Sequence, residues 1–286
     1  MKKRNDSKIT MAALMMMAAM AMTSCASSKK INGDSNVSKD SEMGKNEEDL
    51  DNSYLVLSDT QQDIVKKNNA FALRLFNKVT DMESKVISPM SVSYLMGMLA
   101  NGADGITQQE ILKAIGCEGV SVNDLNELYK AMLLHANHQD KQTTVNIANY
   151  IAVNKNFKLN KNFSQQVSDS YQAGIESLDF TSSKSTDRIN GWCKEKTNGM
   201  IPRIIDQVSA DAVSYLMNAI YFKGIWQNKF NAKDTKLENF RGYTRDIQKV
   251  EMMHQVKKLF YAENKDFKAV DLPYGNGSYR MLVLLP

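Results

Sequence analysis

The chain has 286 residues, of which 43% are hydrophobic and 24% charged, a composition that is typical of a globular protein and excludes overall disorder. The formal net charge is +4, and residues 1–24 alone carry +3, so the rest of the chain is close to neutral. A basic surface for binding nucleic acid is therefore not expected.

The first 24 residues have the pattern of a cleaved export signal. A basic start precedes an apolar run from Met11 to Met22, which is too short to span a bilayer. Small residues then lead to Cys25, which looks like the lipidation site of bacterial lipoproteins. We expect a signal peptide over 1–24 and an acylated Cys25 that anchors the exported protein to the cell envelope, at the outer membrane or cell surface. Secretion into the medium, with a chance cysteine, is the alternative.

Residues 25–57 are expected to form a flexible tether between this anchor and the folded domain. The segment is rich in Ser, Lys, Asn, Asp and Glu, and it buries too little apolar surface to offset its ordering entropy. The folded domain is expected to cover residues 58–286.

The domain begins with an amphipathic helix over 61–80, where apolar residues recur at helical spacing. A short strand is expected at Val86 and Ile87. Ser88 then caps a helix over 89–100, and this helix is apolar nearly all round, as expected of a helix buried in the domain.

Helices and strands are segregated in the remaining sequence. Thr107 and Glu110 have the spacing of a capping box for the next helix, and further helices are expected at 123–137, 160–173 and 185–196. Period-two or short apolar patterns predict strands at 143–153, near 177, and at 213–222, 260–261, 269–272 and 279–285. The strand at 213–222 has large side chains on both faces, which indicates a central strand. Helices first and strands later indicate an α+β domain with mixed sheets.

Several of these segments resemble the serpins, in the order and approximate spacing of that family. The three matching motifs are VISPMS at 86–91, GADGITQQEI at 102–111 and NAIYFKG at 218–224. Trp226 and the sequence LPY, ending at Tyr274, continue the likeness, which covers residues 60–286. The resemblance implies an α+β serpin fold: a helical N-terminal half packed on a large mixed sheet, with further β-sheets, incomplete at the C-terminus.

The resemblance also assigns roles to four side chains. Ser88, Ser91 and Asn218 match the serpin shutter, the point beneath which the main sheet opens. Buried hydroxyl and amide groups at such a place need mutual hydrogen bonds, and Ser88 is expected to serve as a helix cap as well. Trp226 matches the breach tryptophan, where an inserting loop enters the sheet; an ordinary core aromatic is the alternative.

The function implied by the resemblance is inhibition of a serine protease, or of a cysteine protease, by a monomer that needs no cofactor. The protease cleaves a reactive loop, which then inserts into the main sheet. The chain ends at Pro286, before the expected loop, so the residue at P1 is unknown and the family's shutter histidine is also absent. A non-inhibitory serpin that acts as a binding module and an inactive truncated remnant remain alternatives.

An enzyme and a metal site are not expected. The sequence has no G-x-S-x-G, no phosphate-binding glycine loop and no H-E-x-x-H. His135 and His138 have the spacing of two metal ligands, but a third ligand is not evident, and a solvated helix end explains them. Cys117 and Cys193 lie in apolar helical patterns, and we interpret both as buried free thiols rather than as a disulfide.

Overall fold

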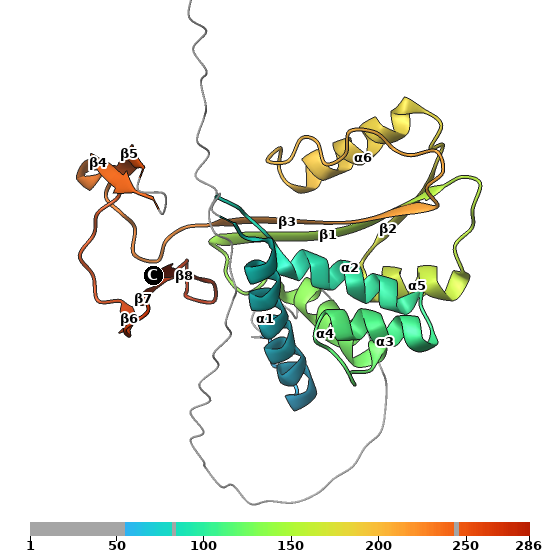
Figure 1. The fold of residues 1–286 in the computed structure, drawn as a ribbon, viewed down its shortest axis with the longest axis horizontal. Helices are drawn as coiled ribbons and strands as arrows, with labels where there is room; N and C mark the ends of the chain where they lie inside the picture. The colour runs from blue at the N-terminus through green and yellow to red at the C-terminus, as the bar shows by residue number, and fades with distance from the viewer. Residues whose placement is uncertain (1–54, 82–83, 243–245) are drawn as a thin grey trace, which may run out of the picture.

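The computed structural model describes residues 55–81, 84–242 and 246–286 (Figure 1). The helices are α1 (Asp59–Val79), α2 (Pro89–Asn101), α3 (Gly105–Ala114), α4 (Val122–His135), α5 (Lys161–Tyr171) and α6 (Ser183–Lys196). The strands are β1 (Thr143–Asn154), β2 (Gly174–Leu178), β3 (Ser214–Gly224), β4 (Lys236–Arg241), β5 (Ile247–Met252), β6 (Phe260–Glu263), β7 (Lys268–Pro273) and β8 (Arg280–Leu285), with a short 3-10 turn, η2, at Ala232–Asp234.

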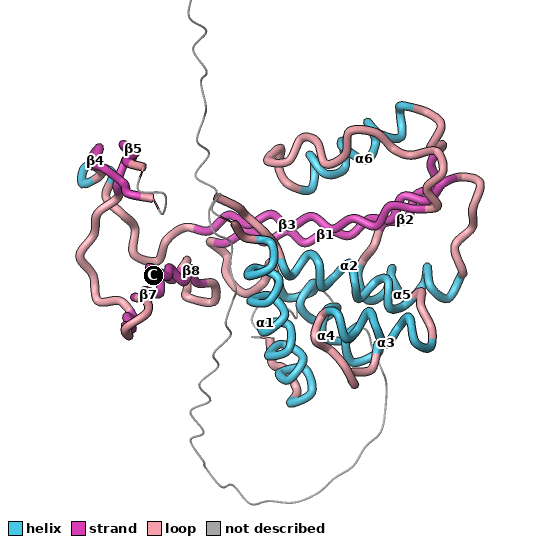
Figure 2. Tube along the Cα trace, viewed as in Figure 1, coloured by secondary structure: helices cyan, strands magenta, loops and turns pink. Residues whose placement is uncertain are grey.

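Three sheets are formed by the described strands. The largest has the order β2-β1-β3, with β2 parallel and β3 antiparallel to β1. β4 pairs with β5, and β6, β7 and β8 form an antiparallel sheet in chain order. Figure 2 shows these two smaller sheets beyond the end of β3, away from the helices.

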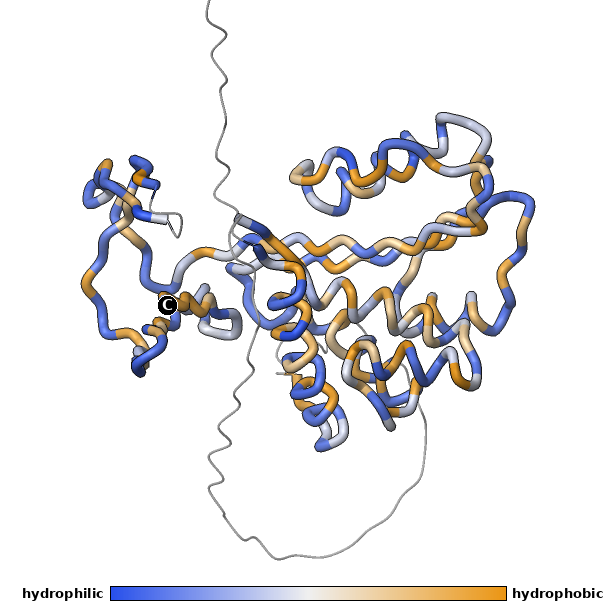
Figure 3. The backbone as a smooth tube through the Cα atoms, viewed as in Figure 1, coloured by the Kyte–Doolittle hydropathy of each residue, from blue (hydrophilic) through white to orange (hydrophobic). Residues whose placement is uncertain are grey.

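Two layers of helices cover the largest sheet. Helices α1 to α5 lie on one face, and α6 lies on the other (Figure 1). The main core lies between the sheet and α1 to α5, with α2 at its centre, where Tyr94 and Met98 are fully buried. Hydrophobic and hydrophilic positions are mixed along α1, as expected of an amphipathic helix that packs on a core with one face (Figure 3). None of the described helices is both long and apolar enough to cross a bilayer.

A second, smaller core lies on the α6 side of the sheet. Trp192 of α6 stacks on Tyr150 of β1 with ring centroids 5.1 Å apart, and Ile189 and Cys193 are buried beside it. The same strand therefore supplies residues to both cores, since successive side chains of a strand point to opposite faces. The α+β fold with mixed sheets, expected from the pattern of elements, is the fold that the structure has.

Some local expectations differ from the structure. Val86 and Ile87 form no strand and pair with none of the described strands, and Val86 is exposed. The cap of α3 is Asp104, whose carboxylate accepts from the N–H of Gly105, so the capping box at Thr107 and Glu110 is wrong. The helix therefore begins at Gly105, before the predicted start.

The predicted place of β3 in its sheet and the predicted start of the folded domain also differ from the structure. β3 is an edge strand among the described residues and β1 is the middle one, so the large side chains on both faces of β3 reflect cover from the two cores. Leu55 and Leu57, at the end of the expected tether, are buried in the main core. The packed part of the chain therefore includes residues 55–57. Cys25 and the rest of residues 1–54 lie outside the described residues.

Candidate functional site

The first turn of α2 carries the two serines to which the resemblance assigns a role. Ser88 has an extended backbone, and its hydroxyl oxygen accepts from the N–H of Ser91 at 3.2 Å. Pro89 occupies the start of the helix, where its missing N–H costs nothing. The Ser91 hydroxyl donates to the Ser88 hydroxyl oxygen at 2.9 Å. Ser88 therefore caps the helix, as predicted, and the two hydroxyls form a hydrogen-bonded pair.

Asn218 lies on β3 directly opposite Asn149 of β1. Its Nδ2 donates to Asn149 Oδ1 at 2.8 Å, and Asn149 Nδ2 in turn donates to the carbonyl of Tyr171 at 2.7 Å. The remaining amide oxygen of Asn218 is buried, and within the described part of the chain it accepts no hydrogen bond. A buried acceptor left without a donor costs roughly 1–3 kcal/mol, so a donor brought to this oxygen would stabilise the sheet.

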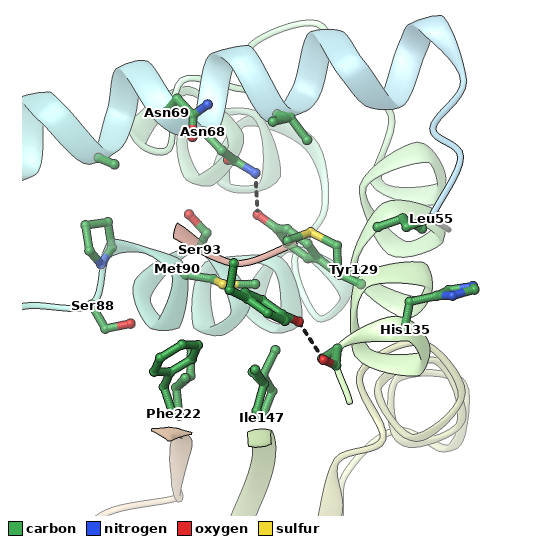
Figure 4. A pocket seen from close by; sticks show the side chains of 18 of the residues that line it. Leu55, Asn68, Asn69, Ser88, Met90, Ser93, Tyr129, His135, Ile147 and Phe222 are labelled. Carbon is green, nitrogen blue, oxygen red and sulfur yellow. Dashed lines mark hydrogen bonds between the residues drawn. The ribbon is translucent and has the colours of Figure 1, made fainter. Parts of the chain in front are cut away.

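A cavity of about 190 Å³ lies between the start of α2 and the sheet (Figure 4). Ser88 lines it from α2, and Ile220 and Phe222 line it from β3. Alternate residues of a strand share a face, so Asn218 lies on the same face of β3 as these two residues. The structure therefore places the serine pair and Asn218 on two elements that face each other across a largely apolar space.

The opposite wall of the cavity comes from α1 and α4. Asn68 Nδ2 donates to the Tyr129 hydroxyl at 3.1 Å, one of the two hydrogen bonds dashed in Figure 4. His135 also lines this wall, with its Nδ1 buried and without a partner in the described residues, whereas His138 is exposed. The expectation of a solvated helix end thus holds for His138 only, because the last turn of α4 packs His135 against the cavity.

Trp226 sits beyond the end of β3 in a cluster of aromatic rings. Its indole stacks on Tyr274 with centroids 4.3 Å apart and planes 12° apart, and Phe230 meets it edge-on at 6.0 Å. Tyr274 also contacts Phe222, which lines the cavity. At about 3.3 Å per residue, Trp226 lies roughly 25 Å along the chain from Asn218, so these two predicted site residues are well separated.

Two contacts of the site were not found from the sequence. Asn149 is the hydrogen-bond partner of Asn218, and Tyr274 is the stacking partner of Trp226. Both partners are remote in sequence, and only the strand register of β1 with β3 and the bridge between Trp226 and Tyr274 bring them together. Polarity in the middle of an apolar strand was the one available signal for Asn149.

The two thiols are free and buried, as predicted. Burial raises the pKa of Cys117 to about 11, and it also raises the pKa of Cys193. Cys117 follows α3 rather than lying in a helix, and its Sγ is 3.7 Å from Asn68 Oδ1. Both are packing residues of the two cores.

The family model described as "Serpin (serine protease inhibitor)" matches residues 66–286, which is most of the chain. The chain belongs to the serpin family. Serine protease inhibitor 42Dd of Drosophila melanogaster is 30% identical over 218 residues, which are 74% of this chain and 59% of that protein. The leukocyte elastase inhibitor of Bos taurus is 33% identical over 228 residues, 77% of this chain and 60% of that protein. This serpin thus spans about 60% of the length of these curated relatives.

Solved serpin structures have the same fold. Tengpin, a thermophilic serpin solved in the latent state, is 32% identical with a TM-score of 0.72, covering 81% of this chain and 62% of that chain. Tengpin in the native state is 30% identical with a TM-score of 0.70, covering 86% and 59%. The predicted serpin fold is confirmed.

The prediction that the chain is simply not an enzyme requires correction. The family model and the relatives named as inhibitors place the chain in a family of protease inhibitors. The comparisons give protease inhibition at the level of the family in its place.

Proposed function

We propose that this serpin inhibits a serine protease as a suicide substrate, and that the cleaved loop of the inhibitor joins the main sheet as a strand beside β3. The observation that carries the proposal is the position of β3. One edge of β3 pairs with β1, and the opposite edge pairs with none of the described strands. Unpaired N–H and C=O groups along such an edge are a template for strand addition, which gains about 0.5–1.5 kcal/mol for each hydrogen bond.

The side chains around the cavity fit the shutter role within this proposal. The Ser88 and Ser91 hydroxyls are small and bond to each other, so they leave room for a strand to move past the start of α2. In this proposal, the free Oδ1 of Asn218 accepts a hydrogen bond from a donor in one arrangement of the sheet, and that hydrogen bond is broken in another arrangement. The stacking of Trp226 on Tyr274 beyond the end of β3 supports the role of the breach tryptophan that we propose for it.

The target class rests on the relatives. One is named as a serine protease inhibitor and others as leukocyte elastase inhibitors. Since this chain spans about 60% of their length, the activity is proposed for the gene product that contains residues 1–286. A cysteine protease is the second target class to be included in the assay.

The test is a covalent complex that survives denaturation. The purified gene product is mixed with elastase-, trypsin- and chymotrypsin-like proteases and with a cysteine protease, and the mixtures are run on a denaturing gel. We expect a band at the summed mass with at least one serine protease and no such band when its catalytic serine is replaced by alanine. Cleavage without a stable complex for every protease would contradict the proposal and favour a non-inhibitory serpin.

We also propose that the protein is exported and anchored through an acylated Cys25. The basic start, the apolar run and the cysteine after small residues support this. In cells fed a labelled fatty acid, the wild-type protein should carry the label and sediment with membranes. Cys25→Ser should lose both properties, whereas Cys117→Ser, at a buried thiol, should keep them. A Cys25→Ser variant that remains labelled would refute the anchor.

A further inference from the structure

Helix α6 and the loop that follows it, residues 183–213, form a unit that is bonded within itself; we call this unit the strap. Asn190 of α6 binds the loop through three hydrogen bonds: its Nδ2 donates to the Ile205 carbonyl, and its Oδ1 accepts from the N–H groups of Ile204 and Ile205. The N–H of Val208 donates to the Thr186 hydroxyl at 3.1 Å. The first part of the loop is thus held to α6, whereas its last part is held to the sheet, where Asn154 of β1 donates to the Ala210 and Ala212 carbonyls.

Fewer buried residues pack the strap against the sheet than pack α1 to α5 against its other face. The core beneath α6 contains nine buried residues, whereas the core beneath α1 to α5 contains eighteen. Regions that bury less apolar surface open at lower free energy than the rest of a protein. The strap is therefore the part of the helical layers that is expected to lift first from the sheet (Figure 1).

A polar cluster joins the strap to the sheet at the β2 edge. Arg188 of α6 binds Glu176 of β2 with both ends of its guanidinium: Nε lies 3.1 Å from Oε1, and the NH2 nitrogen lies 2.8 Å from Oε2. The Tyr150 hydroxyl of β1 donates to the same Oε2 at 2.7 Å. Arg188 also lies over the Tyr150 ring at 5.8 Å, and Trp192 stacks on that ring.

We infer that Tyr150, Glu176 and Arg188 form a latch that sets how often the strap lifts from the sheet. The three side chains come from three different elements and meet at one carboxylate, so loss of Glu176 removes the contacts of both other side chains with it. A two-point guanidinium–carboxylate contact fixes orientation as well as distance, which a single ammonium contact does not. The inference concerns the motion of the strap and does not depend on protease inhibition.

The chain offers a matched control for the latch. Arg203 lies in the loop of the strap and pairs with Asp206 at 3.0 Å, so this ion pair stays within the strap and does not reach the sheet. Its side chain is also more exposed than that of Arg188, 62% against 45%. Removing either arginine changes the charge of the strap equally, but of the two arginines only Arg188 forms an ion pair with another element.

Hydrogen exchange of the backbone amides in the full chain, read by mass spectrometry, tests the latch. In the wild type, amides of residues 187–197 should exchange faster than those in the interior of α2. Arg188→Met and Glu176→Gln should each speed exchange of the α6 amides by about 1.4-fold to fivefold, the range that corresponds to partly exposed ion pairs. Arg203→Met should leave it unchanged, and the α2 amides should be unaffected by every variant.

Combining the variants separates a latch from a general loss of stability. The double variant Glu176→Gln/Arg188→Met should exchange no faster than either single variant, because the two residues act through one contact. Arg188→Lys, which keeps the charge but loses the second contact, should have an intermediate effect. The inference is overturned if α6 exchanges together with α2, if Arg203→Met has the same effect as Arg188→Met, or if the double variant shows the product of the single effects.

Discussion

Replacing Gly97 by alanine is expected to destabilise the fold, although the same change stabilises most helices. Gly97 is buried in α2, where two tyrosine rings approach its backbone. A Cβ built on Gly97 would lie 2.4 Å from the Tyr171 hydroxyl oxygen and 3.0 Å from Cε2 of Tyr129. The hydroxyl belongs to a buried phenol that cannot swing into solvent, so one of these rings or the helix has to move.

The size of the effect follows from one stabilising contribution and two destabilising ones. Alanine gains about 0.5–1 kcal/mol over glycine inside a helix. Inserting a methyl group into a packed core costs about 1–3 kcal/mol. Displacing Tyr171 also weakens its 2.8 Å hydrogen bond to Asn126 Oδ1, which is worth about 0.5–1.5 kcal/mol. We therefore expect Gly97→Ala to lower the free energy of unfolding by about 0.5–4 kcal/mol.

Gly191 of α6 provides the matched control, because it is also helical and a Cβ built there meets nothing within 4 Å. Gly191→Ala should raise the free energy of unfolding by about 0.5–1 kcal/mol. Urea unfolding of the full chain, followed by circular dichroism, measures both changes. Tyr171→Phe should restore part of the loss in the Gly97→Ala background by removing the clashing oxygen. The reasoning is refuted if Gly97→Ala is as stable as Gly191→Ala.

Three further predictions concern other parts of the chain. Gly275→Ala should cost at least about 2 kcal/mol in urea unfolding, because Gly275 has φ +43° and its Cβ would lie 1.7 Å from Asp140 Oδ2. The hydrogen bond from Lys155 lowers the pKa of Asp179 to about 2. This pair should therefore stabilise the fold above about pH 4, and the stabilisation should be lost as the pH falls toward 2. Asp179→Asn should make the acid unfolding curve flatter over this pH range. With its pKa near 11, the Cys117 thiol should resist iodoacetamide at pH 8 in the native chain and react in urea, as mass spectrometry will show.

The sequence predicted well the features that depend on residues next to each other along the chain. Ser88 before Pro89 places the start of α2 because a serine cap and a proline in the first turn act within four residues. The same reasoning failed at α3, where Asp104 and the Thr107–Glu110 spacing are both acceptable local caps. Only the packed position of the helix decides between two such caps, and that position depends on distant contacts.

The contacts of the candidate site depended on long-range register, which the sequence does not display. Asn149 and Asn218 are 69 residues apart, and a shift of one residue between β1 and β3 would turn one amide to the opposite face. Leu55 shows the same limitation at the N-terminal end of the described chain. It follows a long polar segment and stands in the short apolar stretch Leu55-Val56-Leu57, and it is buried where it lines the cavity together with residues of α1 and α4.

Strand β1 shows how the middle of the sheet tolerates residues that strands disfavour. Asparagine is depleted in strands, yet β1 contains it at 146, 149 and 154. The Nδ2 of Asn146 donates to the Lys196 carbonyl, and that of Asn149 donates to the Tyr171 carbonyl. These carbonyls end α6 and α5, and the last carbonyls of a helix have no partner within it.

Because 146 and 149 differ by an odd number, their side chains leave β1 on opposite faces, so one strand satisfies a helix end in each layer. Asn154 extends the arrangement, since its Nδ2 donates to the Ala210 and Ala212 carbonyls of the strap at 3.0 Å. Asn146 thus holds the strap at the end of α6, and Asn154 holds it at the end of the following loop. Tyr150, the β1 residue of the latch, lies between Asn146 and Asn154 along the strand, so the latch contacts the sheet between these two amides.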